Sequence, residues 1–182
     1  LIQTRLFYKN CFYHTAAMMR KTSILDSPYD ETSFAEDYNL WVDLERSWEL
    51  HILDETLMKV RDLPEGLRFK KKCQSGSHQI KKKQLNWLKI NPNEREFKIH
   101  LSLETKNTII DPINVKGKIK WLNKIYNANR KYSIFREPYF TDKLLEHWNS
   151  IINNLTHPTL SIFWAYIRSP LRKIVKKPMR RT

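Results

Sequence analysis

The sequence predicts an α/β fold for its N-terminal part, followed by a mainly helical and basic extension. The apolar run Phe12–Met19 is typical of a buried strand, and a second short strand is expected around residues 52–60. Between them, a short helix is followed by four apolar side chains at helical spacing: Leu40, Trp41, Leu44 and Trp48. The order strand, helix, helix, strand is typical of the closing part of an α/β layer.

The helix that contains Trp41 is expected to begin with a capping box. Ser33 stands three residues before Glu36, which is the S-x-x-E spacing of that motif. Glu36 and Asp37 then lie in the first turn, where free N–H groups and the helix dipole favour ionised carboxylates. An ionised carboxylate at the end of a rigid element is suited to act as a general base. Simple capping by Glu36, and a dipole-favoured carboxylate at Asp37, are the structural alternatives.

The rest of the chain is expected to be a connector and an extension. We expect three parts. Residues 1–66 form the α/β part, residues 67–92 form a basic connector with helical character from Ile80 to Ile90, and residues 93–182 form the extension. In the extension, apolar and polar residues alternate strictly from Phe97 to Leu103, which indicates a half-buried strand. Helical spacing then predicts three helices, at residues 119–126, 144–152 and 160–168.

The chain is strongly basic, with 33 Lys and Arg against 19 Asp and Glu in 182 residues and a formal net charge of +14. The charge is concentrated in two acid-free blocks, at residues 68–83 and 168–181. Such blocks suit phosphate groups in nucleic acids, anionic lipids or sugar diphosphates, and a solvated linker is the alternative for the first block. Three scattered glycines exclude a Gly-rich phosphate loop, and the isolated Cys11 and Cys73 fit a reducing cytoplasm.

No membrane-spanning helix is expected, because the longest apolar stretch, Leu160–Ile167, falls well short of the ~20 residues that cross a bilayer. Its aromatic residues and the basic residues after it indicate an interfacial segment at an anionic membrane surface. The alternative is a terminal helix packed on the body of the protein. The expected location is cytoplasmic, at the inner face of the cell membrane.

Four short segments carry a resemblance to a known family. They are His14–Lys21, Tyr29-Asp30, the octet Phe34–Trp41 and Leu57–Arg61. Their order and spacing resemble the C-terminal half of the catalytic domain of family 2 glycosyltransferases, which are inverting GT-A enzymes that build bacterial surface polysaccharide and lipopolysaccharide. The resemblance covers roughly residues 10–61, and a weaker similarity occurs at residues 77–80. It implies a partial GT-A fold without the N-terminal nucleotide-binding part.

The resemblance also implies roles for individual residues. Asp37 would be the catalytic base that takes the proton of the acceptor hydroxyl, and Glu36 would orient the acceptor or the neighbouring loop. Three further positions would bind substrate: His14, Trp41 and Arg61. A core histidine, a packing tryptophan and a structural ion pair are their respective alternatives. The sequence departs from the family at Ser27-Pro28, where relatives usually have Gly-Gly, and this leaves the acceptor-side geometry open.

The expected partners are a nucleotide-sugar donor and a saccharide or lipid-linked acceptor. The family implies a divalent cation, Mg²⁺ or Mn²⁺, but its Asp-x-Asp motif does not occur in the sequence, so the metal ligands stay unassigned. The chain is therefore expected to be a C-terminal fragment that is inactive alone. The competing hypothesis is a non-enzymatic module that binds nucleic acid, which the charge and interleaved aromatics permit. Against this hypothesis, neither basic block contains a recognisable nucleic-acid-binding motif. It also gives no explanation for the Glu36-Asp37 pattern.

Overall fold

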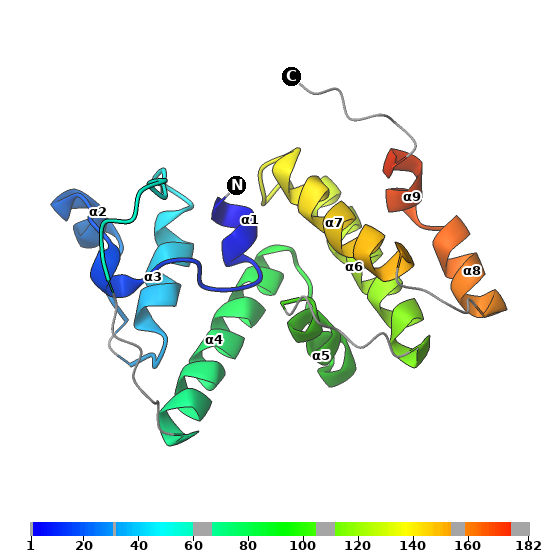
Figure 1. The fold of residues 1–182 in the computed structure, drawn as a ribbon, viewed down its shortest axis with the longest axis horizontal. Coiled ribbons are helices and arrows are strands. Elements are labelled where there is room, and N and C mark those ends of the chain that lie inside the picture. The colour runs from blue at the N-terminus through cyan, green and yellow to red at the C-terminus, as the bar shows by residue number, and fades with distance from the viewer. Residues whose placement is uncertain (1, 31, 60–66, 105–111, 154–158, 176–182) are drawn as a thin grey trace. The chain divides into compact units, whose positions relative to one another are not determined.

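A computed structural model of the chain describes residues 2–30, 32–59, 67–104, 112–153 and 159–175. All regular secondary structure in these ranges is helical (Figure 1). The helices are α1 (Ile2–Leu6), the 3₁₀ helix η1 (His14–Ala16), α2 (Lys21–Asp26), α3 (Glu36–Leu44), α4 (Leu67–Trp87), α5 (Glu94–Ser102), α6 (Pro112–Tyr132), α7 (Tyr139–Asn153), α8 (Leu160–Ile167) and α9 (Pro170–Val175). The chain divides into two compact units, residues 1–84 and residues 85–182.

The predicted α/β fold, and with it a partial GT-A sheet, is wrong for the described residues, which contain no β-strand. The apolar run 12–19 forms an irregular segment around η1, and within it Tyr13 is 71% exposed and Met18 fully exposed. Residues 52–59 are also irregular, with Leu53 66% and Leu57 70% exposed. A strand needs a neighbour for its N–H and C=O groups, and an apolar run alone does not supply one.

The predicted strand at residues 97–103 is the helix α5, because a capping box fixes its start. Asn93 Oδ1 accepts a hydrogen bond from Glu96 N at 2.9 Å, and Asn93 N donates to Glu96 Oε2 at 3.1 Å. The apolar alternation also contains the i, i+4 pair Ile99 and Leu103, and both are buried, Ile99 within α5 and Leu103 directly after it. The apolar pattern at residues 97–103 is therefore compatible with either a strand or a helix, and the capping box at Asn93 favours the helix.

In the first unit, α3 is held between α1 and α4. The Tyr38 hydroxyl donates to the carbonyl oxygen of Leu6 at the end of α1. Near the end of α4, Lys83 Nζ lies 2.6 Å from Asp43 Oδ1 and 3.0 Å from Asn39 Oδ1, both on α3. These contacts hold α3 at Tyr38, Asn39 and Asp43. The start of this helix contains the Glu36-Asp37 pair.

Helix α4 lies close to the residue before α3 at a glycine. A Cβ atom at Gly76 would lie 3.0 Å from both the Cβ and the backbone N of Ala35, the residue that precedes α3. A contact this short is tighter than most Cβ contacts and would require Ala35 to shift by a few tenths of an ångström, so the absence of a side chain at Gly76 permits the approach. Glycine is used here for close packing of two backbones, and the packing positions the first turn of α3.

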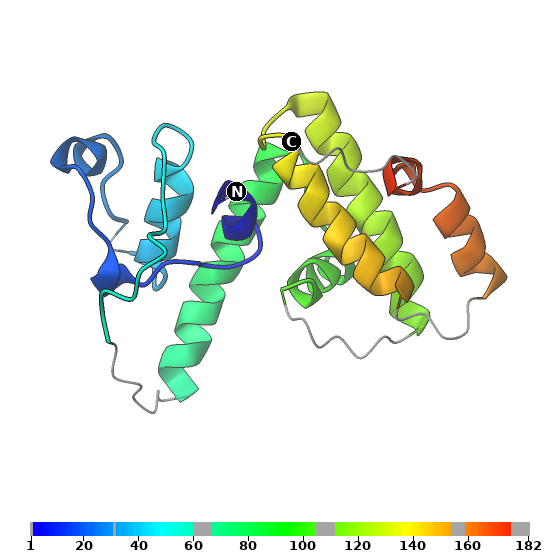
Figure 2. The same ribbon diagram turned by 45° about the horizontal axis from the view of Figure 1, so that its top comes forward.

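The second unit is a helical bundle built on α6 and α7, which lie side by side in both views (Figures 1 and 2). Helices α5, α8 and α9 pack against α6. The core is formed by large apolar residues of both central helices: Ile119, Trp121, Leu122, Ile125, Leu144 and Trp148. The helices predicted at residues 119–126, 144–152 and 160–168 are confirmed as parts of α6, α7 and α8.

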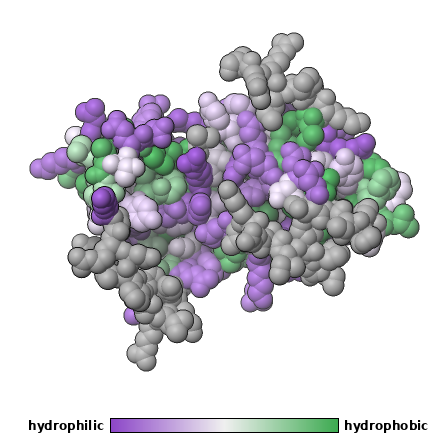
Figure 3. Space-filling view, viewed as in Figure 1, coloured by the Kyte–Doolittle hydropathy of each residue, from purple (hydrophilic) through white to green (hydrophobic). Residues whose placement is uncertain are grey.

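None of the helices in the described ranges is both long and apolar enough to cross a bilayer. Helix α8 has eight residues, which agrees with the expectation that Leu160–Ile167 is too short to span. Hydrophobic side chains are nevertheless exposed along α8, at the right of Figure 3.

Candidate functional site

Predicted site residues from separate segments gather at the start of α3. Here we define the Asp37 cluster by its members: Asn10, His14, Tyr29, Glu36, Asp37 and Trp41. Four of these were predicted from the sequence, and Asn10 and Tyr29 were not. The fifth predicted residue, Arg61, lies outside the described residues.

Asp37 lies in the first turn of α3, and its carboxylate is half-buried. Its Oδ2 accepts a hydrogen bond from Asn10 Nδ2 at 2.9 Å, and its Oδ1 accepts one from the Tyr38 N–H at 2.7 Å. Asn10 Oδ1 in turn accepts from Phe12 N at 3.1 Å, which fixes the irregular segment before η1. Both carboxylate oxygens are therefore oriented, and each keeps a lone pair for a further donor such as an acceptor hydroxyl.

His14 and Tyr29 form the exposed side of the cluster. His14 Nε2 and Tyr29 Oη are 3.0 Å apart and share a hydrogen bond whose direction depends on the imidazole tautomer. Burial raises the pKa of the Tyr29 hydroxyl above its usual value, and the negative charges of Asp37 and Glu36 raise it further. Tyr29 thus lies within electrostatic reach of both carboxylates and links them to His14. His14 itself is exposed, which argues against the alternative of a core histidine.

Trp41 is the buried member of the Asp37 cluster. Its side chain is only 3% exposed, and its ring lies against Phe12, with centroids 5.3 Å apart, and against the edge of His14, 6.4 Å away. Its indole N–H is buried and has no hydrogen-bond partner within the described ranges. A ring so covered leaves no face for a sugar in this structure, and this geometry favours the packing alternative for Trp41.

The predicted capping box at Ser33 and Glu36 is wrong. The residue before α3 is Ala35, and no side chain caps the helix. Ser33 Oγ instead accepts a hydrogen bond from the Ala35 N–H at 3.2 Å, in a turn that ends before the helix begins. Glu36 therefore does not serve as the reciprocal cap, and its half-buried carboxylate is left beside Asp37 and Tyr29.

The cluster does not fit the divalent cation that the sequence resemblance implies. Within the described ranges, no group of three or more His, Cys, Asp or Glu side chains is arranged to hold a metal ion. Glu36 and Asp37 supply two carboxylates, and His14 Nε2 shares its hydrogen bond with Tyr29. The chemistry that these residues offer is proton transfer and hydrogen bonding to hydroxyl groups.

Sequence reasoning missed Tyr29 and Asn10. Tyr29 belongs to the Tyr29-Asp30 pair that contributed to the resemblance, and that pair was the available signal for it. Asn10 lies at the edge of the matched region, 27 positions from its partner Asp37. No local pattern links residues so far apart, so its contact becomes visible only in the folded chain.

The Tyr29 environment yields the first testable prediction. Asp37→Asn removes a negative charge that disfavours the tyrosinate anion, so the pKa of Tyr29 is expected to fall toward its ordinary value. NMR titration of ring-labelled tyrosine measures this shift directly. Asp43→Asn, which removes a carboxylate further along α3, serves as the matched control and is expected to leave the Tyr29 titration unchanged. Equal shifts in both variants would contradict the proximity of Tyr29 to Asp37.

Comparison with protein-family models, with characterised proteins and with solved structures finds no match to this chain.

Proposed function

We propose that this protein takes part in glycosyl transfer, moving a sugar from a nucleotide sugar to a hydroxyl group of a saccharide or lipid-linked acceptor. One observation carries the proposal. Three separate segments of the family-like pattern, around His14, Tyr29 and Asp37, contribute side chains to the same cluster. Their proximity supports treating the three segments as parts of one site.

Asp37 is the proposed base. In an inverting transfer, the acceptor oxygen forms a bond to the anomeric carbon while the bond from that carbon to the diphosphate oxygen breaks. The acceptor proton passes to the Asp37 carboxylate, whose Oδ2 is held by Asn10 at 2.9 Å. Holding the carboxylate in one orientation keeps it within reach of the hydroxyl, and such positioning lowers the entropic part of the barrier.

The neighbouring side chains are suited to bind the acceptor. His14 and Tyr29 present an exposed imidazole and a phenol, which donate to and accept from sugar hydroxyls. Glu36, free of a capping role, can accept from a second acceptor hydroxyl beside Asp37. The Trp41 ring packs against the His14 ring, and we assign Trp41 a packing role.

The donor side of the reaction is assigned to no described residue. Arg61, expected near the diphosphate, lies outside the described ranges. The divalent cation stays an expectation from the resemblance, and no step above depends on it.

A direct assay tests the proposal. The protein, as its gene encodes it, is incubated with UDP-, GDP- and dTDP-sugars and with lipid-linked saccharides extracted from bacterial membranes. Release of nucleoside diphosphate and a matching mass increase of the acceptor are expected for one donor, with inverted anomeric configuration by NMR. Absence of acceptor-dependent release with every donor would contradict the proposal.

A further inference from the structure

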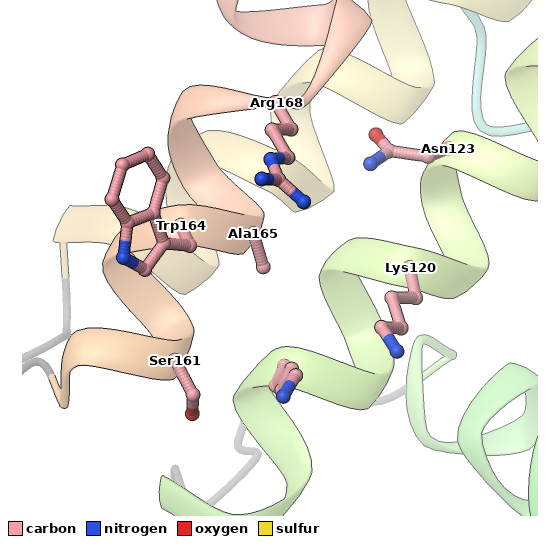
Figure 4. A pocket seen from close by; sticks show the side chains of 7 residues that line it. Lys120, Asn123, Ser161, Trp164, Ala165 and Arg168 are labelled. Carbon is pink, nitrogen blue, oxygen red and sulfur yellow. The ribbon is translucent and has the colours of Figure 1, made fainter.

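The second unit contains a basic groove between α6 and α8, with a volume of about 520 Å³ (Figure 4). Three cations line it together with polar and aromatic groups: Lys116, Lys120, Arg168, Asn123, Ser161 and Trp164. In Figure 4 the Arg168 side chain extends from the end of α8 toward α6, and Lys120 and Asn123 are carried by α6. No acidic residue is among the lining residues, and none of the three cations forms an ion pair within the described ranges.

The groove follows from the spacing of residues on the two helices. Lys116, Lys120 and Asn123 are spaced i, i+4, i+7, so they share one face of α6. On the other side, Ser161 and Trp164 of α8 and Arg168, the residue that follows it, are spaced i, i+3, i+7 and share one face. The two polar faces meet because α6 and α8 pack together.

Helix α8 is anchored in place. Ile162 is 2% exposed, and the Tyr166 ring stacks on Trp148 of α7 with centroids 5.2 Å apart. Just after α8, Ser169 Oγ donates to Asn123 Oδ1 at 2.7 Å, which ties the end of the helix to α6. The groove is therefore part of the packed bundle.

An exposed apolar stripe runs along α8 beside the groove. Leu160 is 80%, Phe163 49% and Trp164 53% exposed, and their i, i+3, i+4 spacing places them on one side of the helix. Trp164 belongs to both surfaces, since it also lines the groove and lies 5.5 Å from the Arg168 guanidinium. Adjacent apolar and basic surfaces on one short helix are typical of segments that lie in a membrane interface.

We propose that this groove binds the phosphate of an anionic phospholipid head group while α8 lies in the bilayer interface. The three cations attract the negatively charged phosphate, and the Ser161 hydroxyl and the Asn123 amide N–H can donate to its oxygens. The stripe enters the boundary between head groups and acyl chains. The proposal is independent of glycosyl transfer.

The apolar stripe distinguishes a lipid from other sources of phosphate. A soluble phosphate or a nucleic acid would engage Lys116, Lys120 and Arg168 but would leave Leu160 and Phe163 in water. A lipid head group at a bilayer surface accounts for both surfaces together. The site also differs from the anchor expected from the sequence, because α6 supplies two of its cations.

The test is co-sedimentation of the full chain with vesicles of phosphatidylcholine alone or of phosphatidylcholine with phosphatidylglycerol. Lys116→Gln combined with Lys120→Gln is expected to weaken binding to the anionic vesicles about 30-fold, since each cation near such a surface contributes ~1 kcal/mol. The matched control, Lys98→Gln with Lys131→Gln, removes the same charge from exposed positions outside the groove and is expected to change binding less than about 3-fold. Equal losses in both pairs would overturn the groove as the site.

A second variant tests whether the groove binds the phosphate of a lipid head group, inorganic phosphate or a nucleic acid. Leu160→Ser with Phe163→Ser alters only exposed side chains and is expected to weaken vesicle binding at least about 10-fold. Its binding to inorganic phosphate and to duplex DNA, measured by calorimetry, should equal that of the unmodified chain. Unchanged vesicle binding by this variant would overturn the lipid assignment. Tighter binding of the unmodified chain to DNA than to anionic vesicles would also overturn it.

Discussion

Asp37→Asn is expected to lower kcat for glycosyl transfer by at least about 10²-fold, with the KM for the nucleotide sugar nearly unchanged. Asparagine keeps the size of the side chain and can still accept one hydrogen bond, but it cannot take a proton from the acceptor. General-base assistance is typically worth ~10²–10⁴-fold in rate, and this sets the scale of the loss. Steady-state kinetics of the protein as its gene encodes it, with donor and acceptor varied separately, measures both parameters.

Two controls on α3 make this result specific. Asp43→Asn removes the same charge from the same helix, but Asp43 pairs with Lys83 and lies outside the cluster. That partly exposed pair contributes at most about 1 kcal/mol, so turnover of Asp43→Asn should stay near the original value. Glu36→Gln should reduce turnover less than Asp37→Asn, because Glu36 is assigned to orienting the acceptor. Near-normal turnover of Asp37→Asn would place the base elsewhere.

Trp41→Ala is expected to destabilise the first unit by about 3–5 kcal/mol, the usual cost of truncating a buried tryptophan. The indole fills the space beneath Phe12 and His14, and its removal leaves a cavity there. Trp41→Phe should cost much less, since a ring remains and the indole N–H has no hydrogen-bond partner within the described ranges to lose. Urea unfolding followed by circular dichroism measures both values.

The same two variants separate packing from sugar stacking at Trp41. If the residue only packs, Trp41→Phe should keep the acceptor KM within about 2-fold, because the indole does not touch the acceptor. If Trp41→Ala kept its stability but lost acceptor affinity, the ring would have to face the sugar. That outcome would contradict the buried position of Trp41.

Helices could be predicted from the sequence where apolar residues follow the 3.6-residue period over two or more turns. This holds for residues 119–126 and 144–152, which lie within α6 and α7. The strand predictions failed for two physical reasons. The run 12–19 is apolar but finds no neighbouring strand within the described ranges, and the alternation at residues 97–103 also fits a helix, which the Asn93 cap selects.

The candidate site was only partly predictable. Glu36, Asp37 and His14 could be named because the sequence resemblance implies roles for these positions. The hydrogen bond from Asn10 to Asp37 and the position of Tyr29 depend on how residues 10–30 fold back onto α3, which no local spacing specifies. The capping box at Ser33 had the right spacing but the wrong geometry, since the helix begins after Ala35.

Chemical rescue is the most direct test of whether the Asp37 carboxylate takes the acceptor proton. Asp37→Ala removes the carboxylate and leaves space beside Asn10 that a formate ion can enter. If Asp37 is the base, added formate should raise the kcat of Asp37→Ala at least about 10-fold in a saturable way, and should not change the original protein or Glu36→Ala. Rescue of Glu36→Ala in place of Asp37→Ala, or turnover of Asp37→Ala near the original value without formate, would contradict the assignment.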